Sequence, residues 1–178
     1  MKAITVVIAC FSLVGSFAAD SSPDKIFSPT VSGKPSYDHQ RELVQKFYTA
    51  LQDNDADALK ELLASDYHVV NAGEVQDSSY SKFTEMSKNI KVRMLALHKA
   101  LPNFTLTISD VLIDDNKALA RVSISGLQQG PFLGIVPTQK PIHIKFFDLF
   151  TFKDGKISHI AEMWNELSVM RQLGYIVL

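Results

Sequence analysis

Residues 142–167 read IHIKFFDLFTFKDGKISHIAEMWNEL, and this stretch decides the fold of the chain. Two segments rich in apolar, β-branched and aromatic residues flank Asp154-Gly155, a dipeptide typical of a two-residue β-hairpin turn. Such a turn pairs Lys153 with Lys156, and every pair further from the turn follows by counting. The stretch therefore predicts two antiparallel strands with a defined register.

This register gives Asp148 an apolar environment. It places Asp148 opposite Ala161, with the other face of the hairpin carrying Glu162 and Trp164. The residues that share the face of Asp148 are Ile144, Phe146, Phe150, His159, Met163 and Asn165. Because that face is mostly apolar, we expect it to point inward, and burial should raise the pKa of the Asp148 carboxyl group. A carboxyl group of this kind is suited to general acid/base chemistry near neutral pH, with His159 as its catalytic partner.

A structural role is the alternative for Asp148. A buried carboxylate and an imidazole that lie diagonally across a hairpin can stabilise each other without any catalysis. The register also assumes that no bulge interrupts the hairpin, since a slip of one residue exchanges the two faces of a strand. His68 and Asn71, which flank a short predicted strand, are further candidates for the wall of a pocket. From the residues alone, both roles of Asp148 remain open.

The rest of the domain predicts helices first and strands after them. Helices are expected over 38–52, over 55–63 and over 83–101, each from apolar residues that recur at helical spacing. Strands are expected over 67–71, 104–113 and 118–124. Within 104–113, the alternation of apolar and polar residues shifts by one position at Ser109-Asp110, which indicates a β-bulge. This order, with helices first and a run of antiparallel strands after them, is the α+β pattern.

The chain begins with a segment typical of an export signal. A short positive start and an apolar run precede small residues at Ser16-Phe17-Ala18, so residues 1–18 are predicted to be a cleavable signal peptide. A flexible lead-in is expected over 19–37 and the folded domain over 38–178. The mature protein is then secreted or periplasmic, without stable insertion into a membrane.

Composition narrows the possible functions further. The chain has 178 residues, 46% hydrophobic content and a formal net charge of -1, which predicts one globular domain that does not bind nucleic acid. Cys10 is the single cysteine and the histidines lack spacing such as HExxH, so no metal site is predicted. The sequence contains no GxGxxG, P-loop or GxSxG motif. Asn103 begins a glycosylation sequon, which matters only in a eukaryotic source.

The loop and hairpin of the last third resemble those of a known family. Residues 126–141 read GLQQGPFLGIVPTQKP, residues 147–157 read FDLFTFKDGKI, and residues 171–174 read RQLG. This combination of glycines, prolines and the Asp-Gly turn is similar to that of the SnoaL-like polyketide cyclases, also called ester cyclases, of the nuclear transport factor 2-like superfamily. The resemblance extends over residues 38–174.

The resemblance implies a cone-shaped, curved antiparallel sheet wrapped around N-terminal helices, with a cavity for a small hydrophobic molecule and a homodimer formed through the sheet. It implies that Asp148 is the general acid/base of an aldol-type ring closure that needs no metal or organic cofactor. Gln128 stands where relatives commonly have His, Ala161 where Trp is frequent and Asn165 where Asp is frequent. These departures predict a wider and less acidic cavity.

Two functions follow from these expectations. The first is a cofactor-independent cyclase or isomerase, in which Asp148 exchanges a proton with a carbonyl compound while His159 or Asn165 holds the developing oxyanion. The second is a noncatalytic carrier or sensor, in which the same apolar pocket only binds its ligand. A purely structural dimer is a third possibility.

Overall fold

A computed structural model provides the structure of the protein and describes residues 36–71 and 89–176. These residues belong to one compact unit that spans Lys34–Leu178. The predicted signal peptide at 1–18, most of the lead-in and the first part of the predicted helix over 83–101 lie outside the described residues.

The described part of the chain contains helices α1 (Ser36–Gln52), α2 (Ala56–Leu62), α4 (Ile90–Ala100) and α5 (Glu166–Leu173). Polar caps explain where the later helices begin. The side chain of Asp55 accepts a hydrogen bond from the backbone N–H of Ala58 at 2.9 Å, and Asn89 and Asn165 cap α4 and α5 in the same way. Side chains of this type satisfy the free N–H groups of a first helical turn. No helix among residues 36–71 and 89–176 has the length and apolar content to cross a membrane.

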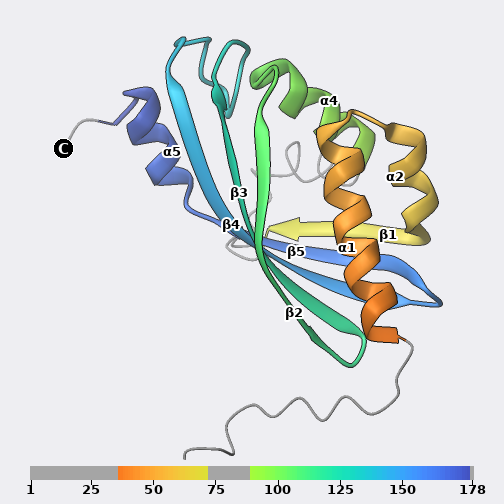
Figure 1. The fold of residues 1–178 in the computed structure, drawn as a ribbon. Coiled ribbons are helices and arrows are strands. Elements are labelled where there is room, and N and C mark those ends of the chain that lie inside the picture. The colour runs from red at the N-terminus through yellow and green to blue at the C-terminus, as the bar shows by residue number, and fades with distance from the viewer. Residues whose placement is uncertain (1–35, 72–88, 177–178) are drawn as a thin grey trace, which may run out of the picture. The chain divides into compact units, whose positions relative to one another are not determined.

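Within the described residues the sheet has five strands: β1 (Leu63–Asn71), β2 (Thr105–Asp114), β3 (Lys117–Leu127), β4 (Pro141–Lys153) and β5 (Lys156–Trp164). Their order in the sheet is β1-β5-β4-β3-β2. β5 pairs with β4, β4 with β3 and β3 with β2 in antiparallel fashion, whereas β1 runs parallel to β5. The α+β class and the curved sheet are as predicted, and the parallel edge strand is a difference from the expected antiparallel sheet (Figure 1).

Bulges in two of the antiparallel strand pairs determine which face of the sheet the side chains beyond them occupy. The register of β2 with β3 shifts between Ile108 and Asp110, which confirms the bulge predicted at Ser109. A second shift lies in the hairpin, where Phe152 pairs with Ile157 but Thr151 pairs with His159. Ser158 is therefore an extra residue on β5, and the predicted register holds only for the first pairs beside the turn.

Helices cover the inner face of the sheet, where the apolar core lies. α1, α2 and α4 lie on one side of the sheet (Figure 1). Along β4 the side chains alternate between buried and exposed from Pro141 to Asp148, and the buried set is Ile142, Ile144, Phe146, Asp148, Phe150 and Phe152. On α1, Leu43 and Phe47 lie one helical turn apart and are both buried, as expected for apolar residues at helical spacing. The inner face of β4 thus projects a carboxyl group into an apolar core.

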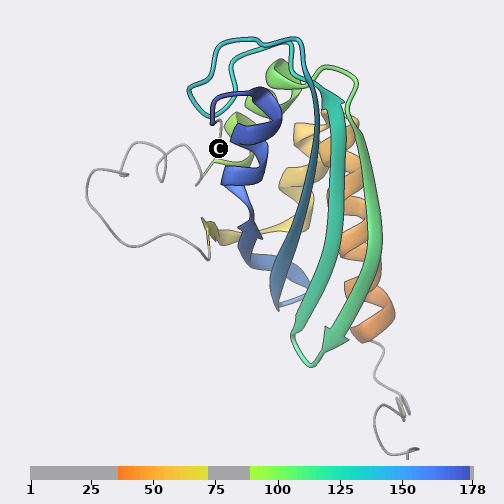
Figure 2. The same cartoon turned by 90° about the vertical axis from the view of Figure 1, so that its left-hand side faces the viewer.

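Helix α5 packs against the end of β4, beyond the last residue that pairs with β5 (Figure 2). The Gln172 side chain accepts a hydrogen bond from the backbone N–H of His143 at 2.7 Å and donates one to the backbone carbonyl of His143 at 3.1 Å. A neighbouring strand would make the same two bonds. The Gln172 side chain therefore replaces β5 as the hydrogen-bond partner of the β4 backbone at His143.

Candidate functional site

Asp148 lies in the middle of the inner face of β4. Its side chain is 2% exposed, which confirms the predicted burial, and its neighbours on the same face, Phe146 and Phe150, are also buried. On the adjoining strand the partner of Asp148 is Ala120, a small buried residue. The carboxyl group is therefore removed from bulk water, and a buried carboxylate is unfavourable unless it is paired or protonated.

Tyr48 on α1 is the direct partner of Asp148. Its hydroxyl group donates a hydrogen bond to Asp148 Oδ2 at 2.6 Å, and the tyrosine is itself fully buried. The Tyr48 ring packs edge-on against Phe150, with ring centroids 5.8 Å apart, and less closely against Phe146 at 6.5 Å. This aromatic packing fixes the position of the hydroxyl group. The other carboxyl oxygen, Asp148 Oδ1, is buried and has no hydrogen-bond partner.

Burial and a neighbouring carboxylate raise the pKa of Asp148 well above its ordinary value. The largest cause is loss of hydration, followed by the negative charge of Glu162. The hydrogen bond from Tyr48 and the positive charge of Arg93 act in the opposite direction and lower the pKa, but they do not offset burial. The carboxyl group therefore holds its proton to a higher pH than a surface aspartate does.

An ion pair lies beside Asp148. Arg93 on α4 donates from one guanidinium nitrogen to both carboxylate oxygens of Glu162 on β5, each at 2.5 Å. Glu162 is the residue directly opposite Asp148 in the β4–β5 register. Both side chains of the pair are about three quarters buried, with 26% and 23% of their surface exposed. The pair places a fixed positive and a fixed negative charge next to the proton-carrying group.

Tyr67 on β1 completes the cluster. Its hydroxyl oxygen is buried and has no hydrogen-bond partner. Burial raises the pKa of Tyr67, Arg93 lowers it, and Glu162 and Asp148 raise it further. The phenol therefore keeps its proton and remains a hydrogen-bond donor. We refer to Tyr48, Tyr67, Arg93, Asp148 and Glu162 as the interior polar cluster.

The bulge at Ser158 changes which residues of β5 join this cluster. The predicted partner of Asp148, Ala161, instead pairs with Leu149, and Phe150 pairs with Ile160 rather than with His159. Glu162, predicted on the outer face, lies opposite Asp148. The prediction that Asp148 and His159 share a face is therefore wrong, because one extra residue on β5 reverses the faces beyond it.

The structure places the remaining predicted pocket residues in different surroundings. His159 and His68 lie side by side, with ring centroids 4.4 Å apart, and His68 is exposed. Met163 is 57% exposed and pairs with Phe147, whereas Trp164, predicted on the face away from Asp148, pairs with Phe146. Of the residues predicted to share the face of Asp148, only those on β4 itself do so, namely Ile144, Phe146 and Phe150.

Gln128 and Asn165 have structural hydrogen bonds. Gln128 is fully buried, its amide nitrogen donates to the carbonyls of Gly130 and Val136, and its amide oxygen accepts from the N–H and hydroxyl groups of Thr138. Gln128 thus holds together the loop between β3 and β4. Asn165 is the N-cap of α5 and accepts from the N–H of Ser168 at 2.9 Å. For Asn71 the structure gives the backbone pairing with Glu162.

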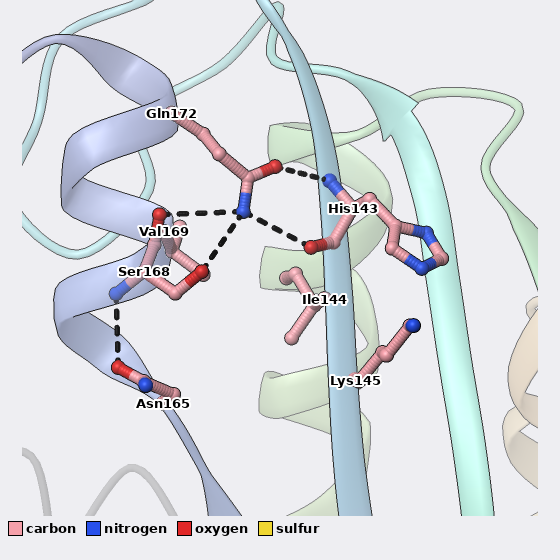
Figure 3. A pocket seen from close by; sticks show the side chains of 7 residues that line it. All are labelled: His143, Ile144, Lys145, Asn165, Ser168, Val169 and Gln172. Atoms are coloured by element: carbon pink, nitrogen blue, oxygen red, sulfur yellow. Dashed lines mark hydrogen bonds between the residues drawn. The ribbon is translucent and has the colours of Figure 1, made fainter.

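A hollow lies between α5 and β4 (Figure 3). It has a volume of about 400 Å³ and is lined by His143, Ile144, Lys145, Asn165, Ser168, Val169 and Gln172. The amide of Gln172 is already occupied by the backbone of His143 and by Ser168. No residue of the interior polar cluster lines this hollow, so its volume does not measure the space beside Asp148.

Four members of the interior polar cluster were not predicted as site residues from the sequence. Tyr48 belongs to the apolar stripe of α1, where a hydroxyl group is the only sign of a polar role. Glu162 was assigned to the wrong face by the missed bulge. Arg93 and Tyr67 come from separate elements whose approach to β4 no local pattern specifies. The residues described contain no group of three or more His, Cys, Asp or Glu side chains that could hold a metal ion.

Solved structures share this architecture. TsrD from Streptomyces laurentii superposes with a TM-score of 0.66 at 22% identity, over 82% of this chain and 100% of that chain. A protein from Jannaschia sp. CCS1 assigned to the SnoaL-like polyketide cyclases gives 0.66 at 17% identity, over 82% and 99%. A protein with a ketosteroid isomerase-like fold from Catenulispora acidiphila, in complex with trimethylamine, gives 0.58 at 17% identity, over 75% and 92%. The fold is thus of the nuclear transport factor 2-like class.

The family follows from the sequence. The sequence model of the SnoaL-like polyketide cyclases matches residues 42–173, from α1 to the end of α5. Because the match covers most of the chain, the protein belongs to the SnoaL-like polyketide cyclase family, as the loop and hairpin predicted. No curated protein is similar enough in sequence to count as a relative of this chain.

Proposed function

We propose that the protein is a cofactor-independent enzyme that acts on a small hydrophobic carbonyl compound, with Asp148 as its general acid/base. The observation that carries this proposal is a carboxyl group that is 2% exposed, has a raised pKa and keeps one oxygen, Oδ1, without a partner. A purely structural aspartate would be expected to pair both oxygens, because an unpaired buried acceptor costs about 1–3 kcal/mol. Membership of a cyclase family supports the same reaction class.

Proton transfer at carbon is the reaction step that this arrangement supports. Tyr48 occupies Oδ2, so Oδ1 is the oxygen that takes a proton from a carbon next to a carbonyl group and later returns it. The aromatic neighbours of Asp148 exclude water and keep the carboxylate basic. Neither His159 nor Asn165 shares the inner face with Asp148, so the oxyanion requires another donor.

Deuterium exchange into α-tetralone tests the proposal, because this ketone has an apolar body, one carbonyl group and acidic α-hydrogens. In deuterated buffer, the wild-type protein should accelerate loss of the α-hydrogen signals in proton NMR. Asp148→Asn keeps the shape of the side chain and should lower the exchange rate at least a hundredfold, whereas Asp114→Asn, at an exposed carboxylate, should leave it unchanged. Equal rates for the wild type and Asp148→Asn would contradict an acid/base role. Tight binding without exchange would favour the carrier.

We also propose that the protein forms a homodimer through the outer face of the sheet. One apolar row crosses all the strands in register: Leu112, Leu119, Leu149, Ala161 and Val70. Beside it, Phe147 is 44% and Met163 57% exposed. An apolar area that continues over several strands is typical of a protein interface. Analytical ultracentrifugation should show a dimer that Met163→Glu converts to a monomer, and a wild-type monomer at high concentration would contradict the proposal.

Export is proposed on the N-terminal sequence alone. A short positive start, an apolar run and small residues at Ser16-Phe17-Ala18 are typical of a cleaved signal peptide. The mature protein should begin at Ala19 or Asp20 when N-terminal sequencing is applied to protein recovered from the medium or periplasm. Protein that retains Met1 in the cell interior would contradict export.

A further inference from the structure

The interior polar cluster contains a second buried oxygen without a partner. Within the described residues, the buried side-chain oxygens that lack hydrogen bonds are Gln40 Oε1, Tyr67 Oη and Asp148 Oδ1. Two of these three belong to the cluster. A lone unpaired group is an ordinary imperfection, but two in one cluster require a common explanation, because each is unfavourable by about 1–3 kcal/mol.

The backbone of β1 directs the Tyr67 side chain toward the interior. The next residue, His68, lies beside His159 and is exposed, and the residue after it, Val69, is 3% exposed. Side chains alternate along a strand, so Tyr67 is on the same side as Val69. Its hydroxyl group is close enough to Asp148 and Glu162 that both carboxyl groups affect its pKa. Tyr67 and Asp148 therefore face a common interior region from two different strands.

We propose that Tyr67 is a substrate-contacting residue whose hydroxyl group donates a hydrogen bond to the oxygen of a neutral carbonyl compound. The inference rests on the proposed acid/base role of Asp148. Asp148 Oδ1 takes the proton from the α-carbon, the electrons of the broken C–H bond form the C=C bond of an enolate, and the carbonyl π electrons move to the oxygen that Tyr67 holds. Return of the proton from Asp148 to carbon restores the carboxylate.

The charges of the cluster define the chemical class of the ligand. The positive charge of Arg93 is already offset by Glu162, whose two carboxylate oxygens both accept from one guanidinium nitrogen, so the ion pair attracts an anionic ligand less than a free arginine would. An anionic ligand would also approach two acidic side chains, Asp148 and Glu162. A neutral ketone places its oxygen at Tyr67, its α-carbon at Asp148 and its apolar body against Phe146 and Phe150.

Paired ligands with and without oxygen provide the test. α-Tetralone and tetralin share an apolar skeleton, and only the ketone can accept a hydrogen bond. The wild-type protein should bind the ketone more tightly, and Tyr67→Phe should reduce the ratio of the two affinities by about threefold to tenfold, the value of one hydrogen bond. Tyr175→Phe is the matched control, because Tyr175 is 67% exposed and its removal should leave the ratio unchanged.

Infrared spectra of α-tetralone labelled with ¹³C at the carbonyl carbon give an independent readout. The bound C=O stretch should move to higher frequency in Tyr67→Phe, because one hydrogen bond to the oxygen is lost, and not in Tyr175→Phe. If Tyr67→Phe does not fold, fluorotyrosine at position 67 keeps the ring and strengthens the donor, so the band should move to lower frequency. An unchanged band, an unchanged affinity ratio, or a wild-type protein that does not prefer the ketone would overturn the inference.

Failure of this inference is distinguishable from failure of the proposed function. If Asp148→Asn exchanges deuterium at the wild-type rate, the acid/base role is wrong, whatever Tyr67 contributes to binding. If Asp148→Asn abolishes exchange while Tyr67→Phe changes neither the affinity ratio nor the carbonyl band, the acid/base role stands and Tyr67 is not the donor.

Discussion

The burial of Asp148 should make the stability of the protein fall as the pH rises, and Asp148→Asn should remove this dependence. The ordinary pKa of the carboxyl group is 3.8 and burial raises it in the folded state. The folded protein therefore binds this proton more tightly than the unfolded chain does. By linkage, the free energy of unfolding decreases with pH between about 4 and the folded pKa, by at most about 1.4 kcal/mol per pH unit.

The magnitude can be worked out for a defined pH range. Below about pH 4 the carboxyl group is protonated in both states and contributes no pH dependence. Between the two pKa values, a range of two pH units lowers the unfolding free energy by at most about 2.7 kcal/mol. Asn at position 148 can still accept the hydrogen bond from Tyr48, so the substitution removes the ionisation and keeps the contact.

Urea unfolding followed by circular dichroism at several pH values measures the effect. The difference in unfolding free energy between Asp148→Asn and the wild type should grow in favour of the variant as the pH rises from 5 to 7. Groups far from Asp148 contribute the same pH dependence to both proteins and cancel in the difference. A wild-type curve parallel to that of Asp148→Asn would refute a raised pKa for Asp148.

Three further perturbations follow from the contacts of the fold. Glu162→Gln removes a negative charge beside Asp148 and leaves the positive charge of Arg93 without its partner, so the pH dependence attributed to Asp148 should move to lower pH. Loss of the ion pair should also lower the unfolding free energy in urea by about 3 kcal/mol. Gln128→Ala leaves several loop backbone groups unpaired and should lower the unfolding free energy by about 2–3 kcal/mol, with faster amide exchange in the loop between β3 and β4. Deleting Ser158 removes the bulged residue and leaves Glu162 opposite Asp148, so the variant should fold and keep a raised pKa at Asp148 in the same titration. Loss of folding in that deletion, or an unchanged pH profile in Glu162→Gln, would contradict the described register.

The local signals of the hairpin were sufficient for much of the fold. The Asp154-Gly155 turn, the burial of the Asp148 face of β4 and the phase change at Ser109 are all determined by residues close in sequence, and these predictions are confirmed. The register counted outward from the turn is wrong beyond Phe152 and Ile157. The spacing of apolar residues around Ser158 also indicates its bulge, as the phase change at Ser109 does for the other one. Ile157 and Ile160 are both buried but are separated by an odd number of positions, which regular alternation does not allow.

The candidate site could be predicted only in part, because most of it is assembled from distant segments. Asp148 was identified from its own strand. Its hydrogen bond to Tyr48 spans 100 positions in the sequence, and the Arg93–Glu162 pair spans 69. These contacts depend on how α1 and α4 lie on the inner face of the sheet. Hydrophobic periodicity determines which face of a helix is buried, but it does not determine which residues of other elements that face contacts.

The most direct test of the account is the protonation state of Asp148. Infrared difference spectra between the wild type and Asp148→Asn isolate the stretching bands of this carboxyl group, and the spectra can be taken from pH 5 to pH 8. The account predicts a band of a protonated carboxyl group that persists well above the ordinary pKa of 3.8 and shifts to lower pH in Glu162→Gln. A carboxylate band alone at pH 5 would contradict it.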